Sequence, residues 1–168
     1  MGVSSSFIGA SGQMGAAVVL NSALGNDIAI GGRVSIIPYS VDTVVQGTWA
    51  SGASATSMVN VDCNNNASKA LNDEIQFKVY LSAGTWTCRI MGTAGTDKAI
   101  WTVSIDGVSA GTQEWYQGAG AVNIIKNTTG IAIAANGLKT LDLKAASKNG
   151  ASSGYGAEFQ IIEFIRTA

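Results

Sequence analysis

The segment Ile75–Gly107, IQFKVYLSAGTWTCRIMGTAGTDKAIWTVSIDG, is the most informative about the fold, because it contains three strand-like runs separated by turn residues. In the first run, Ile75–Leu81, apolar residues alternate with Gln, Lys and Tyr. This period of two is typical of a strand that has one face in a core and the other in water. The second run, Thr85–Ile90, alternates in the same way, and Ser82–Gly84 between them predicts a tight turn. The two runs are therefore predicted to form a hairpin.

A third alternating run, Trp101–Ile105, is followed by Asp106–Gly107, a pair that favours a two-residue hairpin turn. Asn136–Gly137 is a second strong turn signal of this kind. Counting the weaker runs on either side, the sequence predicts eight to ten strands with short connections. That pattern indicates an all-β fold, an antiparallel β-sandwich of the jelly-roll type.

The last predicted strand, Tyr155–Arg166, is apolar on both faces. Strict alternation places Phe159 with Ile161 and Ile165 on one face, and Ile162 with Phe164 on the other. Two apolar faces predict a central strand that is covered on each side, either by a second sheet and the arm described next or by neighbouring subunits. We therefore expect Ile162 and Phe164 to contribute to an interface.

Residues 1–36 differ from the rest of the chain, since small residues dominate them and they contain two charges. Their apolar side chains, among them Phe7, Val18 and Val19, are too numerous for a free disordered tail. We expect an extended N-terminal docking arm over residues 1–36 that packs on its own domain, a sister subunit or a larger assembly. Residues 37–168 are then the β-sandwich domain.

Composition excludes several classes of function. The chain has 168 residues, a size typical of one domain, and a net charge of −1. It has no cluster of Lys and Arg, so we expect no nucleic-acid partner. No apolar run reaches the ~20 residues of a membrane span, so we expect no membrane insertion. The mean hydropathy of +0.24 is high for a monomer and favours oligomerisation.

The sequence contains only weak signals for groups of catalytic or metal-binding residues. Histidine, the commonest general base and transition-metal ligand, is absent from the sequence. Cys63 and Cys88 fit two buried thiols better than a disulfide, and the Asp and Asn residues in turns fit turn formation better than calcium binding. We therefore expect no enzymatic activity, no metal and no cofactor. The N-terminal residues lack the basic segment of a secretory signal, which predicts cytoplasmic synthesis without export.

Aromatic residues are the remaining candidates for binding. Alternation assigns Trp86 and Trp101 to the core. Planar rings pack against sugars when they are exposed among small polar loops. The candidates for such a ligand-binding platform are Tyr80, Trp115, Tyr116 and Tyr155, with interface packing as the alternative.

A further signal comes from strand ends and turns, namely Asp73–Leu81, Ala83–Thr87, Ile105–Gly107, Gly130–Ile131, Asn136–Leu141, Lys148–Asn149, Ser152–Tyr155 and Ile162–Thr167. Together these segments resemble the small jelly-roll domain of tailed-phage structural proteins, which occurs in capsid fibres, decoration proteins and tail-fibre tips. That domain is similar in outline to the trimeric complement C1q and tumour-necrosis-factor fold. The resemblance covers residues 43–168.

The resemblance implies a homotrimer displayed on a virion and made in the host cytoplasm. We expect a capsid decoration or head-fibre protein that docks on the major capsid protein, or on another virion component, through residues 1–36. The alternative is a receptor-binding tail-fibre tip or carbohydrate-binding module that contacts host-surface glycans.

Overall fold

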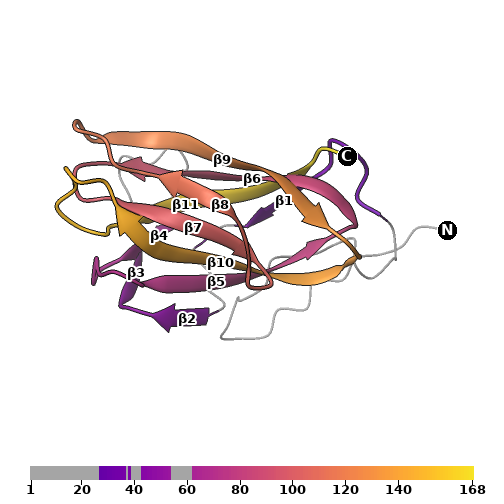
Figure 1. Cartoon of the computed structure of the whole chain (residues 1–168), viewed down its shortest axis with the longest axis horizontal. Helices are drawn as coiled ribbons and strands as arrows, with labels where there is room; N and C mark the ends of the chain where they lie inside the picture. The colour runs from indigo at the N-terminus through magenta and orange to yellow at the C-terminus, as the bar shows by residue number, and fades with distance from the viewer. Residues whose placement is uncertain (1–26, 37, 39–42, 54–61) are drawn as a thin grey trace.

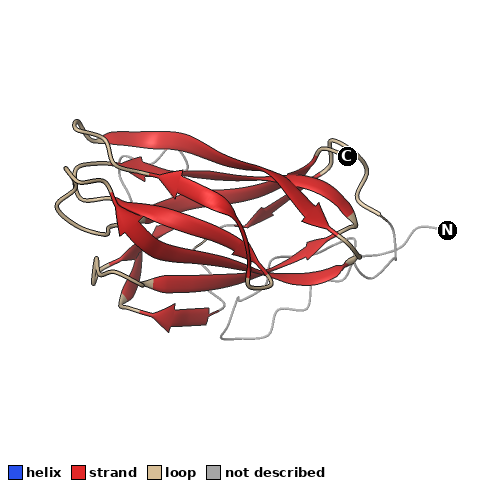
Figure 2. Cartoon of the chain, viewed as in Figure 1, coloured by secondary structure: helices blue, strands red, loops and turns tan. Residues whose placement is uncertain are grey.

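The computed structural model describes residues 27–36, 38, 43–53 and 62–168. This part of the chain consists of strands, turns and loops and contains no helix (Figure 2). The all-β prediction is therefore confirmed for the described residues. The strands are β1 (Arg33–Ile36), β2 (Thr43–Gln46), β3 (Trp49–Ala53), β4 (Asp62–Asn66), β5 (Glu74–Leu81), β6 (Gly84–Ala94), β7 (Ala99–Ile105), β8 (Val108–Glu114), β9 (Ala121–Ile133), β10 (Gly137–Lys148) and β11 (Glu158–Arg166).

The strands form two antiparallel sheets that pack face to face as a sandwich (Figure 1). Sheet A has the order β3-β4-β11-β6-β9, and sheet B has the order β2-β5-β10-β7-β8. In sheet A, β4 pairs with the beginning of β11, and β1 pairs with its end from Ile162 to Ile165. One edge of β11 therefore holds two short strands in succession. The predicted jelly-roll sandwich is confirmed.

The tight turns differ in what they connect. Asp106 and Gly107 have φ angles of 50° and 77°, and they join β7 to β8 in a true hairpin. By contrast, β5 belongs to sheet B and β6 to sheet A, so the predicted β5–β6 hairpin is wrong. Ser82 anchors this crossing, because its hydroxyl accepts a hydrogen bond from Ile28 N and its carbonyl accepts one from Trp86 Nε1.

The connection through Asn136–Gly137 is also a crossing, from β9 in sheet A to β10 in sheet B. A turn residue lowers the cost of reversing the chain, but it does not decide whether the two strands share hydrogen bonds. In a sandwich each crossing brings two apolar strand faces together across the core. The burial of alternate residues in β5 and β6 shows this arrangement.

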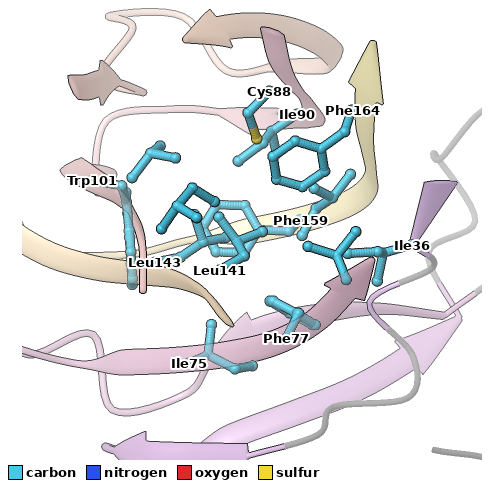
Figure 3. Packing of buried hydrophobic residues seen from close by; sticks show 14 of the residues in the cluster. Ile36, Ile75, Phe77, Cys88, Ile90, Trp101, Leu141, Leu143, Phe159 and Phe164 are labelled. Carbon is cyan, nitrogen blue, oxygen red and sulfur yellow. The ribbon is translucent and has the colours of Figure 1, made fainter. Parts of the chain in front are cut away.

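The core fills the space between the sheets (Figure 3). Phe77, Leu141 and Leu143 enter it from sheet B, whereas Cys88 and Phe164 enter from sheet A. At one end Phe159 contacts three indole rings, with ring centroids 5.2 Å apart for Trp101, 6.2 Å for Trp115 and 6.3 Å for Trp49. These edge-to-face and stacked contacts join the two sheets.

Strand β11 contains a bulge that changes its alternation. Phe159 lies opposite Gly92 and Ile161 lies opposite Met91, which is the next residue of β6, so Gln160 has no opposite residue. One extra residue shifts the phase of the strand. Phe159 therefore joins Ile162 and Phe164 in the core, and its predicted face is wrong.

The predicted interface on β11 is corrected as well. Ile162 and Phe164 are both 0% exposed in the single chain because they pack between its own two sheets. They leave no surface for a neighbouring subunit. The outward positions of β11 are Ile161, Glu163 and Ile165, which are half-buried.

Part of the predicted arm belongs to the sandwich. Strand β1 is hydrogen-bonded to β11, and both Ile28 and Ile36 are buried in the core. The sandwich therefore begins before residue 37, the boundary predicted from the sequence. Phe7, Val18 and Val19 lie outside the described residues, and their predicted role in docking stays a prediction.

Candidate functional site

Trp115 is a core residue. Its side chain is 2% exposed and its ring packs against Phe159. A ring enclosed in this way offers no face to a ligand, so the predicted binding role of Trp115 is corrected. The adjacent Tyr116 is half-buried, as expected for two neighbours of which one faces the core.

Tyr80, Tyr116 and Tyr155 do not form one platform. Tyr80 lies near the last residue of β5, opposite Leu138. Tyr155 lies beyond the other end of β5, because its backbone N–H donates to Lys69 O in the loop that precedes this strand. Tyr116 is bridged to Gly95 in the β6–β7 loop, at the same end of the sandwich as Tyr155.

The loop end that carries Tyr155 is held by buried polar groups. Asn66 and Asp73 are 0% and 1% exposed, and Asn66 Nδ2 donates to Asp73 Oδ2 at 2.9 Å. Asn66 Nδ2 also donates to Tyr155 O, which ties the loop after β10 to the loop after β4. The ammonium group of Lys148 lies 5.3 Å from the Tyr155 ring centroid and covers part of that ring. These contacts hold the loops at this end of the sandwich together, which is a structural role.

Asp97 is the centre of an ion-pair cluster at the same end. Lys69 Nζ lies 2.6 Å from Asp97 Oδ2, and Lys98 Nζ lies 3.6 Å from Asp97 Oδ1. Burial alone would raise the pKa of Asp97, but the Lys69 hydrogen bond and the two lysine charges outweigh it and hold the pKa below its usual range. Neither hollow described below includes this cluster.

The outer face of sheet B carries a pair of neighbouring carboxylates, Glu74 and Asp142. Partial burial raises the pKa of Asp142, and the nearby charge of Glu74 adds to this effect. Lys144 Nζ lies 3.3 Å from Glu74 Oε2 and balances one of the two charges. The carboxylates line neither hollow, so they fit solvated strand-face residues better than a catalytic pair.

A groove of about 360 Å³ lies on the outer face of sheet A. Its volume is at the lower end of the range for small-molecule sites. Strands β1, β11, β6 and β9 each contribute to it, and six of its seven lining residues form two cross-strand rows, whereas Arg33 lies opposite Ile165 beside the first row. The lining residues are Arg33, Ser35, Arg89, Met91, Ile125, Ile161 and Glu163, which we call the sheet A groove.

The first row of the sheet A groove is polar: Ser35, Glu163 and Arg89 lie opposite one another on adjacent strands. The second row is apolar: Ile161, Met91 and Ile125 lie opposite one another on β11, β6 and β9. Because the rows are two residues apart along each strand, about 6.6 Å separates them. The groove therefore presents hydrogen-bonding groups beside an apolar strip.

Two guanidinium groups flank one carboxylate in the polar row. Arg33 Nη1 lies 3.1 Å from Glu163 Oε1, and Arg89 Nη1 lies 3.6 Å from Glu163 Oε2. The side chain of Glu163 is 17% exposed, whereas those of Arg33 and Arg89 are 58% and 36% exposed. The triad carries a net charge of +1, and its positive groups are nearer to solvent.

A second hollow of about 420 Å³ lies between the edges of the two sheets, beside β8 and β9. Small and apolar residues of β8, of the end of β9 and of the position after β9 form most of its lining, namely Val108, Ser109, Ala110 and residues 130–134. Its charged residues, Lys139 and Asp106, pair with each other at 3.5 Å. This hollow offers few unpaired polar groups to a polar ligand.

Other chemistry has little support in the described residues. They contain no group of three or more His, Cys, Asp or Glu side chains that would hold a metal ion. Cys88 is a buried free thiol, and burial raises its pKa, which suppresses the reactive thiolate. Within the same ranges, no helix has the length and apolarity needed to cross a membrane.

Sequence reasoning missed the sheet A groove. The alternation of Arg89 and Met91 in β6 correctly assigns both to the outward face. Which residues of other strands stand beside them depends on strand order and register, which period-two patterns do not contain. The bulge at Gln160 also changes which β11 residues face outward.

The sequence matches no protein-family model, and no curated protein is significantly similar to it. Solved structures do share the fold. A carbohydrate-binding module CBM36 in complex with calcium and xylotriose has a TM-score of 0.58 at 16% identity, covering 78% of this chain and 98% of that one. The C-terminal CBM6 of LamC, a marine laminarinase from Zobellia galactanivorans, has a TM-score of 0.57 at 10% identity, covering 80% and 100%.

Xanthan lyase from Paenibacillus has a TM-score of 0.66 at 18% identity, covering 77% of this chain. The chain spans 12% of the length of that enzyme, so the similarity concerns one part of it. At these identities the comparisons establish the sandwich fold. They match it to the jelly-roll folds of complete carbohydrate-binding modules.

Proposed function

We propose that the described domain is a non-enzymatic glycan-binding module and that the sheet A groove is its binding site. The fold supports this proposal, because the chain aligns with nearly the full length of modules named for carbohydrate binding. The observation that carries it is the pairing of a polar row with an apolar row across adjacent strands of sheet A.

The chemistry of a sugar matches this arrangement. A pyranose ring has hydroxyl groups at its rim and apolar C–H groups on its faces, so it needs hydrogen-bonding groups beside an apolar surface. In the sheet A groove Met91 and Ile161 supply the apolar strip, and Ser35 supplies a hydroxyl. Aliphatic side chains take the place that aromatic rings were predicted to have. Because the site lies on strands, its geometry is preorganised.

Isothermal titration calorimetry of the full chain with a panel of xylo-, manno-, laminari- and galacturono-oligosaccharides tests the proposal. We expect at least one class to bind. The variant Ser35→Leu should strongly weaken this binding, because it replaces the hydroxyl group with a larger aliphatic side chain that fills the groove. Thr112→Leu is the matched control, since it places the same side chain at an exposed hydroxyl position of β8 in sheet B. Absence of binding to every class, or equal loss in both variants, would contradict the proposal.

The virion interpretation stays a prediction that rests on the sequence resemblance. A decoration or head-fibre role requires a trimer and a docking partner for residues 1–36, and a glycan-binding tail-fibre tip would combine this role with the proposal above. Light scattering after gel filtration, followed by incubation of the full chain with capsids that lack decoration, tests it. A trimer that binds capsids and no glycan would favour decoration over the module.

A further inference from the structure

We propose that the sheet A groove selects glycans whose sugar units carry a carboxylate. This inference rests on the proposed function and names the class of ligand for the same site. Its basis is Glu163 in the polar row, which is flanked by Arg89 of the same row and by Arg33, whose position on β1 lies opposite Ile165. A uronic-acid unit would place its carboxylate on the two guanidinium groups and its ring on the strip formed by Met91 and Ile161.

The two guanidinium groups keep capacity for a second acceptor. Each carries five N–H donors, and the recorded contact with Glu163 involves one nitrogen, Nη1, of each arginine. The planar fork of arginine matches the geometry of a carboxylate and forms paired, charge-assisted hydrogen bonds. A ligand carboxylate would therefore find donors from both sides of the polar row.

Glu163 acts as a positioning residue. Its side chain is 17% exposed, and each of its oxygens faces a different arginine. It therefore restrains two long side chains before any ligand arrives, which reduces the rotamer entropy that binding would cost. Because the arginine side chains are more exposed than Glu163, a ligand from solvent meets the positive groups first.

Charge balance distinguishes this groove from two of the other ion pairs, and exposure and the apolar strip distinguish it from the third. Lys144–Glu74 and Lys139–Asp106 are paired one to one, whereas the triad of the groove keeps a net charge of +1. The Lys69–Asp97–Lys98 cluster has the same ratio of charges. Its Lys98 side chain is only 10% exposed, however, and the cluster lines neither hollow. The excess positive charge and the apolar strip occur together in the sheet A groove.

A pair of ligands with the same sugar rings, one with free carboxylates and one with methyl esters, tests the inference. Oligogalacturonides carry free carboxylates, and full methyl esterification removes the charge while keeping the rings. We expect the free acid to bind the full chain about tenfold more tightly than the ester. We also expect this preference to shrink when the ionic strength rises from about 0.05 M to about 0.5 M.

The outcomes separate the two proposals. Binding of neutral oligosaccharides without a preference for the acid would overturn the inference and leave the glycan-binding function intact. Absence of binding to every acidic and neutral oligosaccharide would overturn both.

Variants locate the preference in the groove. Arg89→Gln should weaken binding of the acid about tenfold and leave binding of the ester nearly unchanged, because only the charged ligand uses the guanidinium. Lys144→Gln is the control, since it removes one positive charge from the outer face of sheet B at a side chain that is 44% exposed. Equal weakening by both variants would reveal nonspecific attraction and overturn the inference. Thermal unfolding of each variant shows whether the fold is retained.

Discussion

Both outer faces of the sandwich carry charged side chains, but the two faces arrange them differently. On sheet B, Glu74 lies beside Asp142 and pairs with Lys144, so charges alternate along an ordinary solvated surface. On sheet A, Arg33 and Arg89 share one carboxylate next to an apolar row. The difference shows that strand register, which the pattern of a single strand does not contain, decides whether a polar row lies beside an apolar row.

The largest expected effect is the difference in stability loss between a residue on the inner face of sheet A and its neighbour on the outer face. Phe164→Ala should lower the free energy of unfolding by about 3–5 kcal/mol, because it removes a fully buried ring from the core. Ile165→Ala, one residue further on the outer side, should cost about 1 kcal/mol or less. Urea unfolding measures both. Similar values for the two variants would contradict the assignment of Phe164 to the core.

A smaller effect is expected when two glutamates are compared, Glu163 on sheet A and Glu74 on sheet B, whose side chains are both 17% exposed. Glu163→Gln should lower the free energy of unfolding by about 1 kcal/mol, because it leaves two guanidinium groups without their shared partner. Glu74→Gln should cost less, since losing the pair with Lys144 is offset by relief of repulsion with Asp142. A greater loss in Glu74→Gln would show that the charge arrangements have been assigned to the wrong faces.

The smallest expected effects concern pH and have opposite signs at two aspartates. The pKa of Asp142 is raised in the folded chain, so its ionisation destabilises the fold as pH rises through that value. Asp142→Asn should therefore be more stable than the wild type at pH 7, and the gap should close below about pH 4.

The pKa of Asp97 is lowered in the folded chain, so its contribution is present at neutral pH and is lost as pH falls through the folded pKa. Asp97→Asn should be less stable than the wild type at pH 7, and this gap should also close in acid. Thermal unfolding between about pH 2 and pH 7 measures both variants. A change in stability of the same sign in Asp142→Asn and Asp97→Asn would contradict the environments assigned to the two aspartates.

Sequence patterns predict which segments form strands better than they predict which strands pair with one another. Alternation in Ile75–Leu81 and Trp101–Ile105 correctly identified two strands and their buried faces. The turns at Ser82–Gly84 and Asn136–Gly137 were located correctly, but they join different sheets. Turn chemistry is local, whereas pairing depends on how apolar faces meet across the core.

Two features of the candidate site were beyond sequence reasoning for physical reasons. The bulge at Gln160 arises from pairing with β6, so nothing in the local pattern of β11 signals it. The meeting of Arg33 with Glu163 joins residues 130 positions apart in the chain. Aromatic side chains were the stronger signal in the sequence, yet Trp115 serves the core because burial of a large ring stabilises the fold.

NMR mapping of the isotope-labelled full chain, titrated with an oligogalacturonide, is the most direct test of whether the sheet A groove binds an acidic glycan. We expect the largest backbone and side-chain shifts along the sheet A groove, at Ser35, Arg89, Met91, Ile125 and Ile161, with little change on sheet B. Shifts centred on Tyr116 and Tyr155 at the loop end, or no shifts at millimolar ligand, would overturn the assignment of the binding site to this groove.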